Sequence, residues 1–236
     1  MTELRSLPAK RLRGMAAAGD RILECYRVLR KSDANVVGEV LRGQGEFYEW
    51  DHYPKGDVYD HETHGQYYYH THPADLRGGE HGHFHTFLRP KGMPAGVKPA
   101  PLADFKPPKD RNDALSHLVA ISTNKAGYPI GLFTTNRWVT GEAWYAAKDV
   151  IRMVDRFLMD LAYPSWPVNI WITDMLRLFR PQIEELLVAR DRTVEQWQGE
   201  HPKGNTYEDR DLEITSVIEI SVESQIENVR RARAAA

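Results

Sequence analysis

The segment Gln66-Tyr67-Tyr68-Tyr69-His70-Thr71-His72 is followed, after a short interval, by Glu80-His81-Gly82-His83-Phe84-His85-Thr86-Phe87-Leu88. Both segments are rich in aromatic residues, which favour strands. Residues 73–79 between them contain a proline and two consecutive glycines, which favour a turn or a short loop. The sequence therefore predicts an antiparallel hairpin made of strands 66–72 and 80–88.

Histidines alternate along both predicted strands, and alternate side chains of a strand share one face. An antiparallel hairpin that closes around Leu76 gives three cross-strand pairs: Tyr68 with His85, His70 with His83, and His72 with His81. Up to five imidazoles then lie on one patch of the sheet. A register shifted by one residue would place the two rows on opposite faces, and the sequence leaves the register open.

A cluster of imidazoles favours a bound metal ion. Neighbouring imidazoles repel one another when they are partly protonated near neutral pH, and a divalent cation that binds the neutral nitrogens removes this conflict. Iron, copper and zinc all suit imidazole ligands. The expected ligands are His70, His72, His81, His83 and His85. Glu80 and Tyr68 are the candidate catalytic residues, Glu80 as a base or further ligand and Tyr68 as a hydrogen-bonding group. Histidines that merely pack, and metal-free histidine chemistry, stay open as alternatives.

The rest of the chain predicts an α+β fold with an antiparallel sheet of about five or six strands. Residues 9–31 have the apolar spacing of an amphipathic helix. Further strands are expected at 46–53, 117–123 and 130–136, so that residues 46–136 form a His-rich sheet. Residues 90–113 hold six prolines, too many for a helix or an interior strand, and are expected to form either a lid or a static surface loop.

Residues 142–236 are expected to be mainly helical. A helix from Glu142 to about 161 ends before Pro164, a second begins near Val168, and Pro181 restarts it as a third. Residues 212–222 alternate and favour a final strand, although a helical reading stays open, and Ser221 is expected to cap a short terminal helix. We therefore treat residues 1–236 as a single domain with an N-terminal helix and helices after the sheet.

Composition and charge exclude several classes of protein. The chain has 236 residues, 31 Lys and Arg against 33 Asp and Glu, and a sequence pI of about 6.6, so it has no basic field for nucleic acid. We expect neither a membrane span nor a secretory signal, and Cys25, the single cysteine, is consistent with a cytoplasmic protein. Motifs typical of nicotinamide, P-loop, serine-elbow and HExxH zinc enzymes are absent. A small-molecule substrate is the expected partner, and homo-oligomerisation is left open.

Two short motifs resemble known enzyme families. His70-Thr71-His72-Pro73 is similar to the HSHP or HTHP core of the JAMM zinc isopeptidases, which implies zinc ligands at His70 and His72; the serine and aspartate that follow in that family are Glu80 and His83 here. The segment 81–87 resembles the histidine-triad signature of nucleotide hydrolases and transferases. That resemblance implies that His83 is a nucleophile toward an α-phosphate, with its two neighbouring histidines orienting it.

Two further resemblances imply less about the function of the protein. The order HxH, Glu, His on an antiparallel sheet is similar to a cupin, although Glu80 follows His72 at a longer spacing than the cupin pattern has. The QYYYH and EHGHFH segments also resemble an uncharacterised bacterial domain family, from which no function transfers.

The sequence leads to a metal-binding protein, and more specifically to a non-haem metalloenzyme that uses iron, copper or zinc. One rival is a metal-independent nucleotide hydrolase or transferase of histidine-triad type, with a covalent intermediate on His83. A second rival is a non-catalytic metal-buffering or metal-sensing protein. Outside the hairpin, His52 and Glu49 could reach the site, and Arg137 could bind a carboxylate or phosphate or pair with Glu142. His117 is expected to be incidental.

Overall fold

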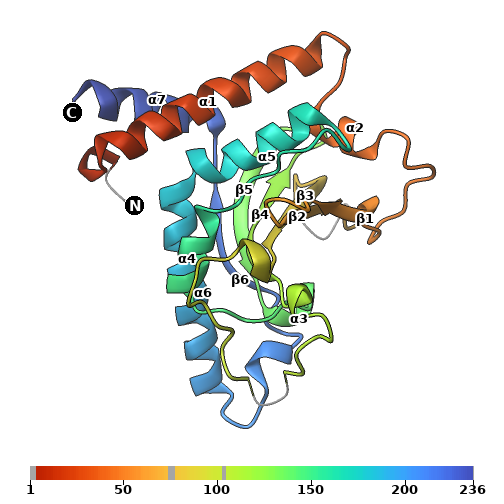
Figure 1. Cartoon of the computed structure of the whole chain (residues 1–236), viewed down its shortest axis with the longest axis vertical. Helices are drawn as coiled ribbons and strands as arrows, with labels where there is room; N and C mark the ends of the chain where they lie inside the picture. Colours follow the sequence, from red (N-terminus) through yellow and green to blue (C-terminus); the bar gives the residue numbers. More distant parts are fainter. Residues whose placement is uncertain (1–3, 74–77, 103–104, 236) are drawn as a thin grey trace.

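The computed structural model describes residues 4–73, 78–102 and 105–235. Six strands in these residues form one antiparallel sheet in sequence order (Figure 1). They are β1 (Tyr53–Tyr59), β2 (Gly65–His70), β3 (Gly82–Leu88), β4 (Ser116–Thr123), β5 (Pro129–Thr135) and β6 (Ile214–Glu219). The α-helices are α1 (Ala9–Arg30), α2 (Val36–Leu41), α3 (Arg137–Thr140), α4 (Ala147–Val154), α5 (Trp166–Leu178), α6 (Arg180–Glu200) and α7 (Val222–Ala234). The predicted α+β class is confirmed.

Helices cover the face of β2 and β3 that carries Tyr67, Tyr69 and Phe84. The Phe84 ring lies 5.4 Å from that of Trp171 on α5, and the Tyr67 hydroxyl donates a 2.7 Å hydrogen bond to Asn169 of the same helix. Helices α1 and α7 stack outside α5 (Figure 1). Burial of a side chain such as Phe84 contributes about 1.5–3 kcal/mol. Packing on this face fixes the orientation of β2 and β3, so the alternate side chains of both strands point to the opposite face.

The hairpin register is the one that brings the histidines together. His70 pairs with His83 and Tyr68 pairs with His85, as predicted. Leu76, on which the prediction centred the turn, lies outside the described residues. The strands are shorter than predicted at the hairpin end, so His72 and His81 lie beyond the paired region.

The prediction of a strand at 46–53 was wrong. The strand is Tyr53–Tyr59, and the segment Lys55-Gly56-Asp57, expected to be a turn, lies inside it as an irregularity. Gly56 and Asp57 have φ angles of 87° and 62°, in the left-handed region, so the ladder shifts between Tyr53 and Val58. An outer strand tolerates this interruption and the adjacent Pro54, because no strand in the described part of the chain pairs with its second edge.

Most helix predictions are confirmed, with one exception near residue 142. The helix predicted from Glu142 to about 161 is shorter at both ends: α4 covers only Ala147–Val154, and neither residues 142–146 nor residues 155–165 are helical. At the N-terminal end, the Glu142 carboxylate instead accepts a 2.6 Å hydrogen bond from the His117 backbone N–H. Pro181 lies in the first turn of α6. The Ser221 hydroxyl caps α7 by accepting from the Ser224 N–H, and the alternating segment before it forms β6.

In the proline-rich segment 90–113, the described residues 90–102 and 105–113 are irregular apart from two short 3-10 turns, at Pro90–Gly92 and Arg111–Asp113. Its described part is held down at several points. The Ala100 N–H donates a 2.7 Å hydrogen bond to the Trp144 carbonyl, and Met93 and Val97 pack against the hydrophobic core. These contacts hold the described part of the segment against the rest of the protein. Among the described residues, no helix combines the length and apolar character needed to cross a bilayer.

Candidate metal centre

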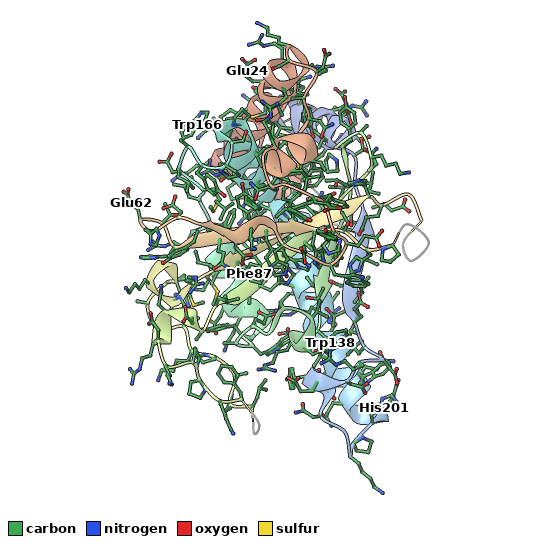
Figure 2. All side chains as sticks on the ribbon, turned by 90° about the vertical axis from the view of Figure 1, so that its right-hand side faces the viewer. Glu24, Glu62, Phe87, Trp138, Trp166 and His201 are labelled. Atoms are coloured by element: carbon green, nitrogen blue, oxygen red, sulfur yellow. The ribbon has the colours of Figure 1, made fainter. Side chains whose placement is uncertain are left out.

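The face of β2 and β3 opposite the helices gathers imidazole rings. Strand alternation directs His70, His83 and His85 to this face, opposite Tyr69 and Phe84. Phe87 continues the row, and its ring lies 5.6 Å from the Tyr68 ring. Figure 2 shows Phe87 near the middle of the molecule. His83, His85 and Phe87 are all buried, so this row of side chains lies inside the protein.

Three of the histidines converge closely enough to hold one metal ion. One ring nitrogen from each of His70, His72 and His83 lies within 4.8 Å of the others. The Nε2 atoms of His70 and His83 are 2.7 Å apart. His83 is 1% exposed and His70 is 9% exposed, whereas His72 is half-buried, so the group reaches the surface on the His72 side.

The three nitrogens fit a metal ion after small movements. In a tetrahedral site with metal–nitrogen bonds of about 2.0–2.1 Å, two ligand nitrogens are about 3.3–3.4 Å apart, so the widest pair, within 4.8 Å, must close by at most about 1.5 Å. The His70–His83 nitrogen pair must open from 2.7 Å to about 3.3 Å for a tetrahedral arrangement. Side-chain rotations of this size need no change in the sheet.

Glu80 turns inward and fixes the orientation of His83. Its Oε1 atom lies 2.7 Å from His83 Nδ1, and its Oε2 atom accepts a 2.6 Å hydrogen bond from the Ser122 hydroxyl. This arrangement places the proton of His83 on Nδ1 and directs the Nε2 lone pair toward His70. Metal-bound histidines commonly donate their second N–H to a carboxylate in this way. The structure thus places Glu80 behind a candidate ligand.

His85 lies beside the three-histidine group and contacts a histidine that we expected to be incidental. The His85 and His83 rings are 4.7 Å apart, and His85 Nδ1 lies 3.0 Å from His117 Nε2. Burial, with smaller contributions from the charges of Arg190 and His83, lowers the pKa of His117 to about 3. His117 is therefore neutral at physiological pH. The sequence did not show this contact, because it depends on the pairing of β3 with β4, in which His117 lies opposite Phe87.

Tyr68 lies between the cluster and the β1 side of the sheet. Its ring stacks on His52 at a centroid distance of 3.6 Å and an interplanar angle of 8°, and it lies 5.1 Å from the ring of His85. Burial raises the pKa of the Tyr68 hydroxyl well above its usual value, so the phenol stays protonated. Of the predicted outer residues, His52 is thus brought to the cluster, with its Nδ1 3.1 Å from Asp57.

His81 does not join the other histidines. Its Nδ1 lies 2.7 Å from the Tyr69 hydroxyl, which belongs to the opposite face of β2. His81 precedes β3, so strand alternation does not apply to it, and Gly82 leaves the space through which Tyr69 reaches it. Burial, reinforced by Lys125, lowers the pKa of His81. Of the five expected ligands, His70, His72 and His83 thus form a group, His85 lies beside it, and His81 contacts Tyr69 instead.

Comparison with known proteins gives a family and no function. No curated protein and no solved structure matches the chain. A protein-family model matches residues 16–220, which include the sheet and all of the histidines described above. The chain belongs to the family described as "Domain of unknown function (DUF6969)".

Proposed function

We propose that the protein binds one divalent transition-metal ion through His70, His72 and His83 and acts as a metalloenzyme. The observation that carries this proposal is the convergence of three ring nitrogens within 4.8 Å, on strands whose register is fixed by packing on the opposite face. The Glu80 carboxylate supports it, because it holds His83 in the tautomer that a metal ligand requires.

The number of ligands favours catalysis over a structural role. Structural zinc sites use four protein ligands, whereas catalytic sites keep a position for water or substrate. Three histidines leave such a position, and the half-buried His72 gives it a route to solvent. An iron, copper or zinc ion at this point supplies Lewis-acid or redox chemistry to a small substrate.

The histidine-triad alternative fits the geometry less well. A nucleophilic His83 needs a ring nitrogen directed at a phosphate. In the structure His83 Nδ1 contacts Glu80 and His83 Nε2 contacts His70, and the residue is 1% exposed. The triad mechanism also gives no role to His70 or His72. The described contacts therefore favour the metal site.

Elemental analysis tests the proposal. Untagged protein, purified without chelator and without a nickel column, is analysed by ICP-MS beside the variants His70→Ala and His72→Ala. We expect a stoichiometric transition metal in the wild type and its loss from both variants. His201→Ala is the matched control, since His201 lies at the far lower end of the view in Figure 2 and should keep the metal. A wild-type protein without metal that iron, copper and zinc all fail to stabilise would refute the proposal.

Azide and cyanide separate an enzyme from a buffering or sensing protein. A metal ion with an open position binds these anions, and its absorption spectrum changes when they are added to native protein that holds iron or copper, or to protein in which cobalt replaces zinc. An unchanged spectrum would show a closed site and overturn the catalytic part of the proposal.

A further inference from the structure

An exposed aromatic loop lies beside the three-histidine group. Residues 43–52 lie between α2 and β1 and project from one side of the molecule (Figure 1). The side chains of Phe47, Tyr48 and Trp50 are all exposed, and Trp50 is the most exposed of them, at 56%. Large apolar side chains that gather on a surface commonly mark a binding site. The loop is thus a candidate binding surface.

Trp50 contacts the histidine on the solvent side of the proposed metal centre. The centres of the Trp50 and His72 rings are 4.4 Å apart, and the rings meet edge to face at 86°. The Trp50 backbone N–H donates a 3.0 Å hydrogen bond to the carbonyl of Thr71, the residue before His72. The indole is thus held against a proposed metal ligand, while more than half of its surface stays in solvent.

The backbone of Trp50 has a conformation that tryptophan rarely adopts. Its φ angle is 72°, in the left-handed region, where glycine and asparagine are the usual residues. The Tyr53 hydroxyl helps to hold the loop in this shape, because it accepts a 2.6 Å hydrogen bond from the Tyr48 N–H and donates one of 3.2 Å to the Tyr48 carbonyl. Strained residues of this kind cluster at binding and active sites. The chain thus keeps a large aromatic side chain at an unfavourable backbone position and leaves it exposed.

The charge around Trp50 is negative. Its direct neighbours in the sequence are Glu49 and Asp51, and both are exposed. Residues 43–57 contain four carboxylates and one lysine, which gives a formal charge of −3 with histidine neutral. The face of an indole ring attracts cations, and tryptophan does so more strongly than the other aromatic residues. The ring and its neighbours therefore favour the same kind of ligand, a cation.

A ligand on the indole lies within reach of an ion held by the histidines. A metal–nitrogen bond of about 2.1 Å puts the ion about 3 Å from the centre of the His72 ring, and so within about 8 Å of the centre of the Trp50 ring. A cation bound over the indole lies within about 6 Å of the ring centre. The two charges are then at most about 14 Å apart, a distance that a small organic molecule spans.

We propose that Trp50, Glu49 and Asp51 bind the ammonium group of an organic amine. The indole supplies a cation–π contact and the carboxylates supply negative charge, whereas an anion is repelled and an uncharged molecule gains from neither. Given the metal centre proposed above, on which this second step rests, the amine is its substrate. The ammonium group is held at Trp50, and the remainder of the molecule extends past His72 to the ion. Trp50 thus selects the class of substrate.

Fluorine NMR of protein labelled with 5-fluorotryptophan tests the cation site. Tetramethylammonium is the probe, because it has no atom that can bind a metal, and tert-butanol is its uncharged counterpart of similar size. Both are titrated into metal-free, full-length protein, in which Trp50→Phe identifies the Trp50 signal. We expect a saturable shift of this signal with tetramethylammonium and none with tert-butanol. Sodium chloride should reduce the shift, since salt screens exposed carboxylates.

Trp166 is the matched internal control. It is 50% exposed, close to the value for Trp50. Its sequence neighbours carry no charge, and Glu39, which accepts a hydrogen bond from Ser165, is paired with Arg42. Equal shifts for both tryptophans, or equal responses to both probes, would overturn the proposal. A Trp50 signal that shifts with protein concentration alone would also overturn it, because a second copy of the chain would then cover the indole.

Substitutions separate the two parts of the site. Saturation-transfer NMR of the methyl protons of tetramethylammonium measures binding to each variant, and circular dichroism confirms that each is folded. Trp50→Leu should weaken binding about two- to fivefold by removing the cation–π contact. Glu49→Gln combined with Asp51→Asn should weaken it about two- to tenfold. Glu62→Gln, at the other end of β2, should leave it unchanged. Wild-type affinity in the folded Trp50 variant or in the folded double variant would contradict the assignment.

Copper-loaded protein tests the connection between the cation site and the metal centre. Methyl protons within about 14 Å of a paramagnetic ion relax faster, so tetramethylammonium should relax faster with copper-loaded than with zinc-loaded wild type. His70→Ala, which should lose the ion, is the control and should show no difference between the two metals. Equal relaxation with copper and zinc in the wild type would refute the assignment of the amine as the substrate of the metal centre.

The two proposals fail in different ways. If ICP-MS finds no metal but the Trp50 signal responds to tetramethylammonium, the metal centre and the substrate role are refuted and the cation site stands. If metal binds through His70 and His72 but the Trp50 signal does not respond, the cation site is refuted alone.

Discussion

Replacing Glu80 with alanine should weaken metal binding by about 100-fold. Glu80 does not belong to the three-histidine group, but its Oε1 lies 2.7 Å from His83 Nδ1 and its side chain is 9% exposed. Loss of a carboxylate behind a metal-bound histidine costs 10- to 100-fold in affinity, or about 1.4–2.7 kcal/mol. A short, charged and largely buried hydrogen bond belongs at the upper end of this range.

Two milder substitutions should give a graded series. In Glu80→Gln the amide oxygen can still accept the His83 N–H, but without a negative charge, so the expected loss is about tenfold. Ser122→Ala removes only the hydroxyl that donates to Glu80 Oε2, and the expected loss is below about tenfold. The predicted order of affinity is wild type, Ser122→Ala, Glu80→Gln and Glu80→Ala.

Competition with a chromophoric chelator measures these affinities. Each protein is titrated with zinc in the presence of the chelator at one neutral pH, and circular dichroism confirms that the variants are folded. The exposed Glu62 provides the control, since Glu62→Ala removes a carboxylate far from the cluster. If Glu80→Ala binds zinc within twofold of the wild type, the carboxylate does not support a ligand, and the assignment of His83 loses its main support.

Three further predictions concern the framework of the site. Gly82→Ala should lower the free energy of unfolding, measured by chemical denaturation, by about 1–3 kcal/mol, because the added Cβ would lie 2.5 Å from the His70 carbonyl oxygen. Gly14→Ala is the control: Gly14 lies on α1 with open space around it, and this substitution should raise the free energy of unfolding by about 0.5–1 kcal/mol. Burial lowers the pKa of His117 from 6.5 to about 3, so between these pH values the unfolded metal-free protein binds a proton at this residue and the folded protein does not. The free energy of unfolding should therefore fall as the pH drops from 6.5 toward 3. Urea titrations of His117→Gln should lack this part of the pH dependence. Tyr69→Phe should cost about 1 kcal/mol by removing the contact with His81, while metal content measured by ICP-MS stays unchanged; a loss of metal would mean that His81 matters to the site.

The hairpin could be predicted because its information is local. Alternation of aromatic residues and histidines along 66–72 and 80–88 predicts both strands and the residues that share a face of each strand. The register stayed open, because a shift of one residue would place the two rows on opposite faces, and the structure supplies it by pairing His70 with His83. The end of the strand could not be read in the same way. His81 continues the alternation in sequence, yet β3 begins at Gly82, and the loss of strand geometry by one residue sends this side chain to Tyr69.

Other parts of the site depend on contacts between distant segments. His117 joins the cluster only because β4 pairs with β3, and an isolated histidine carries no sign of its partner strand. Glu142 was expected to begin a helix, since the apolar spacing after it is helical. Its carboxyl instead meets the His117 backbone, a contact between two segments that only the folded sheet brings together.

The irregular β1 has a consequence for the behaviour of the protein in concentrated solution. An outer strand with a regular row of free N–H and C=O groups can recruit a strand from another molecule, and this is a common start of aggregation. Pro54 supplies no N–H, and the left-handed residues Gly56 and Asp57 turn the backbone out of register with any straight neighbour. The irregular backbone of β1 therefore disfavours the addition of a strand from another chain at this edge of the sheet, which is the edge nearest the histidines.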